Sequence, residues 1–182
     1  VCIVLTQAGE FTLRVGHLST IKARLPLAFV VGFVAISLPM VVLTSMFNIS
    51  ALSAFAISAA LILILNAFSF RRVMVCTPHN WGDVAITIVL LIIIGLLAKV
   101  PVSSHTTLLN TGVLPIWSDY FIHGVTIASF GSRFATGFDM ELAGVSRAFY
   151  HYSPFMIPAA FQSVSGMSGL ALATSLLLPL GL

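Results

Sequence analysis

The feature that most limits how this chain can fold is a long stretch without charge, residues 25–70. It contains no Asp, Glu, Lys, Arg or His. About 20 apolar residues cross a bilayer as a helix, so the stretch is long enough for two crossings. Only a short polar sequence, Asn-Ile-Ser at 48–50, interrupts it. We therefore predict membrane-spanning helices over about 26–47 and 51–70, joined by this turn as an antiparallel hairpin.

The composition of the whole chain agrees with a membrane environment. Hydrophobic residues make up 59% of the 182 residues and charged residues 7%, and the mean hydropathy is +1.11. Soluble domains carry roughly 25% charged residues, so a water-soluble fold of this size cannot hide so much apolar surface. The net charge of +3 is spread along the chain and forms no basic stripe, so we do not expect nucleic-acid binding.

Further apolar stretches predict more helices. A third span is expected over about 84–100, with Asp83 as its N-cap and Pro101 ending it. A fourth is expected over about 168–182. Between them, residues 154–164 predict a helix that is short for a span and therefore re-entrant or interfacial, and a Ser-Gly pair separates it from the fourth span.

Both ends of the sequence lie within apolar runs, at Val1 and Leu182. We therefore expect an internal fragment of a longer protein, forming a single integral membrane domain. Cys2 and Cys76 lie far apart and neither belongs to a CxxC motif, so we predict no disulfide and no zinc site. The expected fold class is all-α, a polytopic transmembrane helical bundle.

The basic residues predict an orientation in the membrane. Lys22 and Arg24 precede the first span, and Arg71 and Arg72 separate the second from the third, whereas the hairpin turn has no basic residue. The positive-inside rule places the basic segments in the cytoplasm. The long polar loop at 101–153 then faces outward, and we expect a multi-pass protein of the cell membrane with this loop on the non-cytoplasmic side.

The outward loop holds the most suggestive residues. We predict a short interfacial helix within it, over about 118–130, and on this helix Asp119 and His123, four residues apart, share one face. The carboxylate could orient the imidazole, both could hold one metal ion, or either could act as a general base. The opposite face, with Phe121 and Val125, suits the membrane interface. The alternative is a capped interfacial helix on which His123 is merely solvated.

A second polar segment lies just before Pro154. Arg147, Tyr150 and His151 are residue types that bind a phosphate or pyrophosphate, because arginine offers a planar fork and tyrosine adds a donor. The alternative is an aromatic belt at the start of a helix.

Other polar residues carry weaker signals. Asp139 and Glu141 are candidates for holding a divalent cation, the only cofactor that the sequence suggests, and a solvated loop is the alternative. Glu10 and Arg14 predict a polar cytoplasmic face on a helical stretch. The sequence contains no P-loop, GxSxG or HExxH motif.

The order of these elements resembles a known class of enzymes. A W-x-D-x-x-x-H segment at 117–123 and an F-Y-H-Y-S-P segment at 149–154, followed by apolar helices, resemble bacterial membrane proteins related to the GT-C class of glycosyltransferases. The resemblance covers roughly 84–182. It implies a polyprenyl-phosphate sugar donor, with Asp119 as base or metal ligand. Candidates for binding the donor are Trp117, Arg147, Tyr150 and His151.

Three functions remain open at this point. The first is transfer of a sugar from a lipid-linked donor on the outer face, with Asp119 and His123 as the catalytic pair. The second is a transporter or flippase of lipids or small solutes, which predicts ionisable or helix-breaking residues in the middle of the membrane. Pro39 and Asn66 are the candidates for that role. The third is a non-catalytic membrane assembly protein. Membrane lipids are expected partners in every case.

Overall fold

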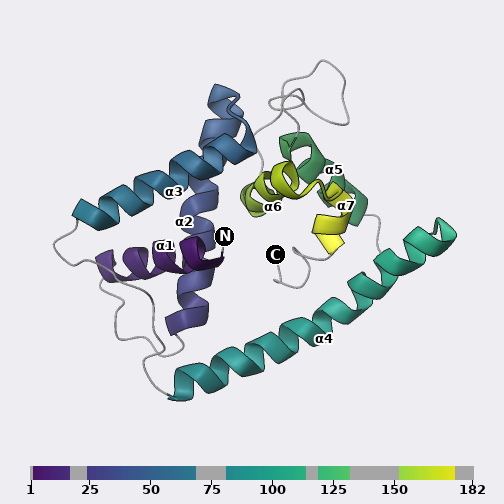
Figure 1. Cartoon of the computed structure of the whole chain (residues 1–182), viewed down its shortest axis with the longest axis horizontal. Helices are drawn as coiled ribbons and strands as arrows, with labels where there is room; N and C mark the ends of the chain where they lie inside the picture. Colours follow the sequence, from purple (N-terminus) through teal and green to yellow (C-terminus); the bar gives the residue numbers. More distant parts are fainter. Residues whose placement is uncertain (1, 17–23, 69–80, 114–118, 132–151, 175–182) are drawn as a thin grey trace.

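The computed structural model describes residues 2–16, 24–68, 81–113, 119–131 and 152–174, and these residues form helices and no strand. The fold of this described part is an all-α bundle, as predicted (Figure 1). Its helices are α1 (Cys2–Val15), α2 (Arg24–Phe47), α3 (Ala51–Phe68), α4 (Trp81–Thr111), α5 (Asp119–Gly131), α6 (Ser153–Ser165) and α7 (Gly169–Leu172).

Three of these helices are long and apolar enough to cross a membrane. The candidate spans are Leu25–Phe47 in α2, Ala51–Phe68 in α3 and Trp81–Lys99 in α4. Their positions agree with the first three spans predicted from the sequence, and they support a membrane protein. The described residues stop at 174, so most of the fourth predicted span, 168–182, lies outside them and stays a prediction.

The turn between α2 and α3 is as short as predicted. Asn48 ends α2 in a left-handed conformation (φ 53°), which asparagine tolerates better than most residues. Ser50 caps α3, since its Oγ accepts a hydrogen bond from the Ser53 backbone N–H at 3.2 Å. The two helices then diverge (Figure 1), and the buried residues of α3 lie only in its first half, at Ala51, Ala54, Ser58 and Ala59.

Two glycines bring α1 and α2 into close contact. A Cβ atom on Gly9 would overlap the carbonyl oxygen of Ala28, and one on Gly32 would overlap the carbonyl oxygen of Leu5. Small residues allow helix backbones to approach in this way, which is a common mode of packing in membranes. The packed α1 is therefore a part of the bundle that sequence analysis did not assign.

The charged residues of α1 do not form the solvated face predicted for them. Glu10 is 1% exposed, and its Oε1 accepts a hydrogen bond from Arg14 Nε at 2.7 Å. The two residues are one helical turn apart, so their ion pair forms within α1. Because Gly9 draws α1 against α2, the neighbouring carboxylate is carried into the packed interface and requires this partner.

Helix α4 differs from its predicted bounds. It begins at Trp81, so Asp83 lies in its first turn rather than at its N-cap, and it continues through Pro101 to Thr111 instead of ending there. A proline removes one backbone hydrogen bond, which a long helix tolerates. The stop signal is Gly112, which has φ 71° and donates its N–H to the Leu108 carbonyl at 2.8 Å. The first part of the predicted loop is thus helix.

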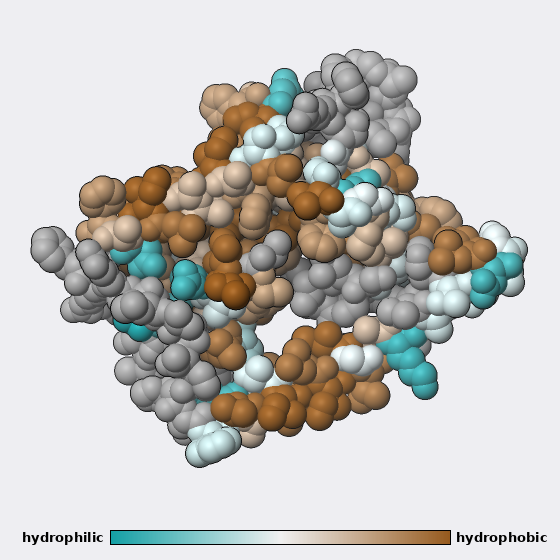
Figure 2. Space-filling view, viewed as in Figure 1, coloured by the Kyte–Doolittle hydropathy of each residue, from teal (hydrophilic) through white to brown (hydrophobic). Residues whose placement is uncertain are grey.

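Helix α4 also stands largely apart from the bundle. Only 6% of its apolar span is buried, against 28% for α3 and 44% for α2. Figure 1 shows α4 as a long separate rod, and Figure 2 shows hydrophobic residues along its visible surface. An apolar surface of this kind is stable in contact with lipid chains.

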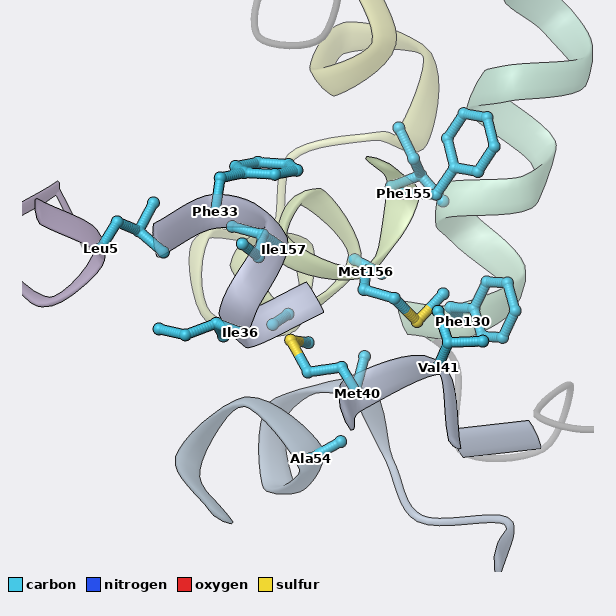
Figure 3. Packing of buried hydrophobic residues seen from close by; sticks show 14 of the residues in the cluster. Leu5, Phe33, Ile36, Met40, Val41, Ala54, Phe130, Phe155, Met156 and Ile157 are labelled. Atoms are coloured by element: carbon cyan, nitrogen blue, oxygen red, sulfur yellow. The ribbon is translucent and has the colours of Figure 1, made fainter. Parts of the chain in front are cut away.

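Helix α6 lies at the centre of the bundle. Six consecutive residues, 155–160, are buried, which means that α6 is covered on all sides there. Its bounds agree with the short helix predicted over 154–164, and Gly166 (φ 69°) ends it at the predicted Ser-Gly break. Figure 3 shows where its side chains meet those of neighbouring helices, with Met156 of α6 close to Val41 of α2 and Phe130 of α5.

The start of α6 lies beside the middle of α2. The Oγ atoms of Ser153 and Ser37 are 2.6 Å apart, and Ser37 is near the centre of the span Leu25–Phe47. About two turns further along α2, the Thr44 hydroxyl contacts Met156 Sδ at 3.5 Å. The polar segment that precedes α6 in sequence therefore leads to a point level with the middle of a candidate span.

Candidate functional site

The predicted acid–imidazole pair lies on a helix, as its spacing requires. Asp119 is the first residue of α5, and His123 follows one turn later. The described helix confirms the predicted bounds, 118–130, to within one residue. The side chain of Asp119 lies outside the described residues, so its contact with His123 stays a prediction.

His123 faces the bundle rather than solvent or lipid. Its half-buried ring lies 5.1 Å from the Phe155 ring of α6 (centroid to centroid) and 6.0 Å from the Tyr120 ring, in an edge-on arrangement. Further along the same face of α5, Ile127 and Phe130 are fully buried. His123 therefore packs against aromatic rings while remaining partly exposed, and its role in a site stays a prediction.

The opposite face of α5 is exposed, as predicted. Phe121 is 48% and Val125 41% exposed. In a membrane protein such side chains contact lipid or the interface. One face of α5 thus carries His123 with the buried Ile127 and Phe130, and the other carries exposed apolar side chains.

A close crossing with α7 fixes α5 from another side. A Cβ atom on Gly124 would lie 2.8 Å from the Leu170 Cα, and one on Gly169 would overlap the Gly124 carbonyl oxygen. Ser168 caps α7 by accepting the Ala171 backbone N–H at 3.1 Å. Since Gly124 is adjacent to His123 in sequence, this crossing limits how far the imidazole can move.

The second candidate segment meets the first at its described end. Tyr152 precedes α6, and its ring lies 5.1 Å from the ring of Phe130 on α5. Phe155, three residues later, holds the ring of His123. Tyr152 and Phe155, at the described start of α6, therefore pack against Phe130 and His123 of α5.

Several predicted site residues cannot be placed. Trp117, Arg147, Tyr150 and His151 lie outside the described residues, as do Asp139 and Glu141. Of these residues, His151 is adjacent in sequence to the described Tyr152. Among the described residues, no group of three or more His, Cys, Asp or Glu side chains is arranged to hold a metal ion.

Two buried hydroxyl residues beside the site were not predicted from the sequence. Ser37 and Thr44 are both 0% exposed, and they lie on α2 where Ser153 and Met156 of α6 meet it. Their spacing of seven residues within a charge-free span was an available signal, because it places both on one helix face. Their partners on α6 could not be inferred from that spacing.

Comparisons with known proteins add no relative: no family model, no curated protein and no solved structure matches this chain.

Proposed function

We propose that this chain is a glycosyltransferase-like integral membrane protein that transfers a sugar from a lipid-linked donor on the non-cytoplasmic face of the membrane. One observation supports a site over scattered interfacial residues. The ring of His123 packs against Phe155, close to the point where the second polar segment enters α6. The described ends of two segments suggested separately by the sequence thus lie on helices that pack together, which supports the proposal.

The chemistry follows from the residues assigned to the site. Asp119 or His123 would accept the proton of an acceptor hydroxyl, and the proton leaves that oxygen as it attacks the anomeric carbon of the donor. The bond between that carbon and the phosphate oxygen breaks, and the phosphate stays on the lipid. Arg147, Tyr150 and His151 would bind this phosphate as its negative charge increases.

The position of α6 suits a donor that is held by a lipid chain. Ser153 lies beside the middle of α2, so the start of α6 is recessed into the bundle. A substrate anchored in the bilayer can reach such a site from the side. Trp117 would contribute at the edge of the site, where aromatic residues favour the interface.

The test is transfer of radiolabelled sugar from a polyprenyl-phosphate donor in membranes that contain the intact protein. Replacement of the acid or base, Asp119→Asn or His123→Ala, is expected to lower the rate about 100-fold or more. The matched control is Phe121→Ala on the exposed face of the same helix. If both site variants retain the activity of the unaltered protein, the catalytic assignment fails.

A transporter is the second candidate, favoured by the shape of α6 itself. This helix has 13 residues, begins beside the middle of a candidate span, and is followed by a break at 166–168 before α7. Short helices that end within the membrane form the substrate sites of many secondary transporters. Uptake of a polyprenyl-phosphate sugar or a small solute into proteoliposomes, without chemical transfer, would favour this function. Absence of both activities would favour an assembly protein.

A further inference from the structure

The hydroxyl pair of Ser37 and Ser153 joins two parts of the bundle that are distant in sequence. Their Oγ atoms are 2.6 Å apart, and the residues are separated by 116 positions. Ser37 is 0% exposed, and its hydroxyl also contacts its own helix, at 3.3 Å from the Val34 carbonyl. A hydroxyl that can donate to that carbonyl and accept from Ser153 is held in one rotamer.

The apolar contacts around α6 fix its position along α2 less well than the contact between Ser37 and Ser153 does. The buried residues of α6 include Phe155, Ile157 and Pro158, but Ala159 and Ala160 are small and the flexible side chain of Met156 adapts to several arrangements. Its apolar neighbours on α2 include Met40. A single buried polar contact often fixes the register between helices that would otherwise slide.

The register of α6 decides where the site residues lie. Ser153 is the first residue of α6, and Phe155, two residues later, is the side chain that contacts the ring of His123. Tyr152, one residue earlier, contacts Phe130. A shift of α6 along α2 would therefore move both aromatic contacts between α6 and α5.

We propose that Ser37 is a positioning residue, whose hydrogen bond to Ser153 sets the register of α6 on α2 and thereby holds His123 in place. Ser37 does not touch the reacting groups in this proposal; it acts through Phe155. The catalytic consequence rests on the proposed function, whereas the structural consequence does not.

A matched pair of substitutions in α2 tests the proposal. Ser37→Ala removes the hydroxyl that contacts Ser153. Ser45→Ala makes the same change in the same helix, but the Ser45 Oγ is buried without a hydrogen-bond partner, so no bond is lost. Ser37→Thr restores a hydroxyl at the first position.

The first measurement is the kinetics of sugar transfer from the polyprenyl-phosphate donor. Ser37→Ala is expected to lower kcat about tenfold, with the KM for the donor little changed, because small misplacements of a catalytic group reduce the rate of the chemical step. Ser45→Ala should retain kcat, and Ser37→Thr should recover most of it. An unchanged kcat in Ser37→Ala, or an equal loss in Ser45→Ala, would overturn the proposal.

The second measurement does not depend on activity. In a background with Cys2→Ser and Cys76→Ser, disulfide formation between His123→Cys and Phe155→Cys reports how often the two positions meet. Ser37→Ala should slow this reaction, and Ser45→Ala should not. If the unaltered protein transfers no sugar but this difference appears, the positioning role stands and the proposed function fails. Equal cross-linking rates contradict the positioning role, whatever the activity.

Substitution at the other end of the hydrogen bond provides a further check if Ser37→Ala assembles poorly. Ser153→Ala should slow cross-linking as Ser37→Ala does, and the double variant should show little additional effect, because both changes remove the same bond. Independent, additive effects would show that the two hydroxyls act separately and would overturn the proposal.

Discussion

The apolar spans of α2 and α4 have nearly the same mean hydropathy, yet they are buried to very different extents. In α2, 44% of the apolar span is buried within the bundle, whereas in α4 only 6% is. Both satisfy the length and composition needed to cross a bilayer. Hydropathy therefore identifies which helices enter the membrane, but it does not determine which of them pack together there.

The difference lies in the side chains at contact positions. The face that α2 buries includes Phe33, Ile36 and Val41, but it also contains small, flexible or hydroxyl-bearing residues, namely Ala28, Gly32, Ser37, Met40 and Thr44. The middle of α4 consists mostly of Ile, Leu and Val, and its single internal glycine, Gly95, has no neighbour where a Cβ would lie. Lipid chains are as apolar as leucine, so helix association depends on close packing and hydrogen bonds rather than on hydrophobicity.

The largest difference in stability between changes in α2 and in α4 is expected from adding one methyl group to each helix. Gly32→Ala would place a Cβ into the backbone of α1, so the helices must separate, and we expect the free energy of unfolding to fall by about 3 kcal/mol or more. Gly95→Ala meets open space and should raise it by roughly 0.5–1 kcal/mol, since alanine favours a helix. Unfolding in mixed detergent measures both. Equal effects would contradict the close packing of α1 and α2.

That close packing shows what the sequence could and could not predict. Charge-free length gave the spans in α2 and α3, and proline and glycine positions gave α6, because these signals act locally. Helix α1 was not predicted to be part of the bundle, because its 14 residues include the charged Glu10 and Arg14. Its packing depends on the contact of Gly9 with Ala28, which the sequence does not reveal. The extension of α4 was not predicted, because a proline such as Pro101 commonly ends a helix, whereas this helix continues to Gly112.

The candidate site divides in the same way. The placement of Asp119 and His123 one turn apart on α5 was predictable, since four residues make about one helical turn. The contact of His123 with Phe155, and that of Ser37 with Ser153, join residues far apart in sequence. Such contacts result from tertiary packing, for which a single sequence holds no local signal.

Truncating one large side chain in each helix tests whether α2 and α4 differ in how tightly their side chains are packed. Met40 is 0% exposed, so Met40→Ala leaves a cavity and should lower the free energy of unfolding by about 2–5 kcal/mol. Leu91 in α4 is 62% exposed, and Leu91→Ala should change it by less than about 0.5 kcal/mol. The same unfolding assay applies. A large effect of Leu91→Ala would mean that a partner covers α4 in the intact protein.

The smallest expected difference concerns two threonine hydroxyls with similar local bonds. Thr44 Oγ1 donates to the Met40 carbonyl at 2.8 Å and also contacts Met156 Sδ of α6 at 3.5 Å, whereas Thr87 Oγ1 donates to the Asp83 carbonyl at 2.7 Å within α4. Valine keeps most of the shape and removes only the hydroxyl. We expect Thr44→Val to cost about 0.6 kcal/mol, the average for a polar contact between membrane helices. Thr87→Val should cost close to nothing, because its bond lies within a single helix that makes few contacts.

A double-mutant cycle with Met156→Leu isolates the contact between α2 and α6, and a coupling of zero would assign the stability of this junction to apolar packing and to the Ser37–Ser153 bond alone.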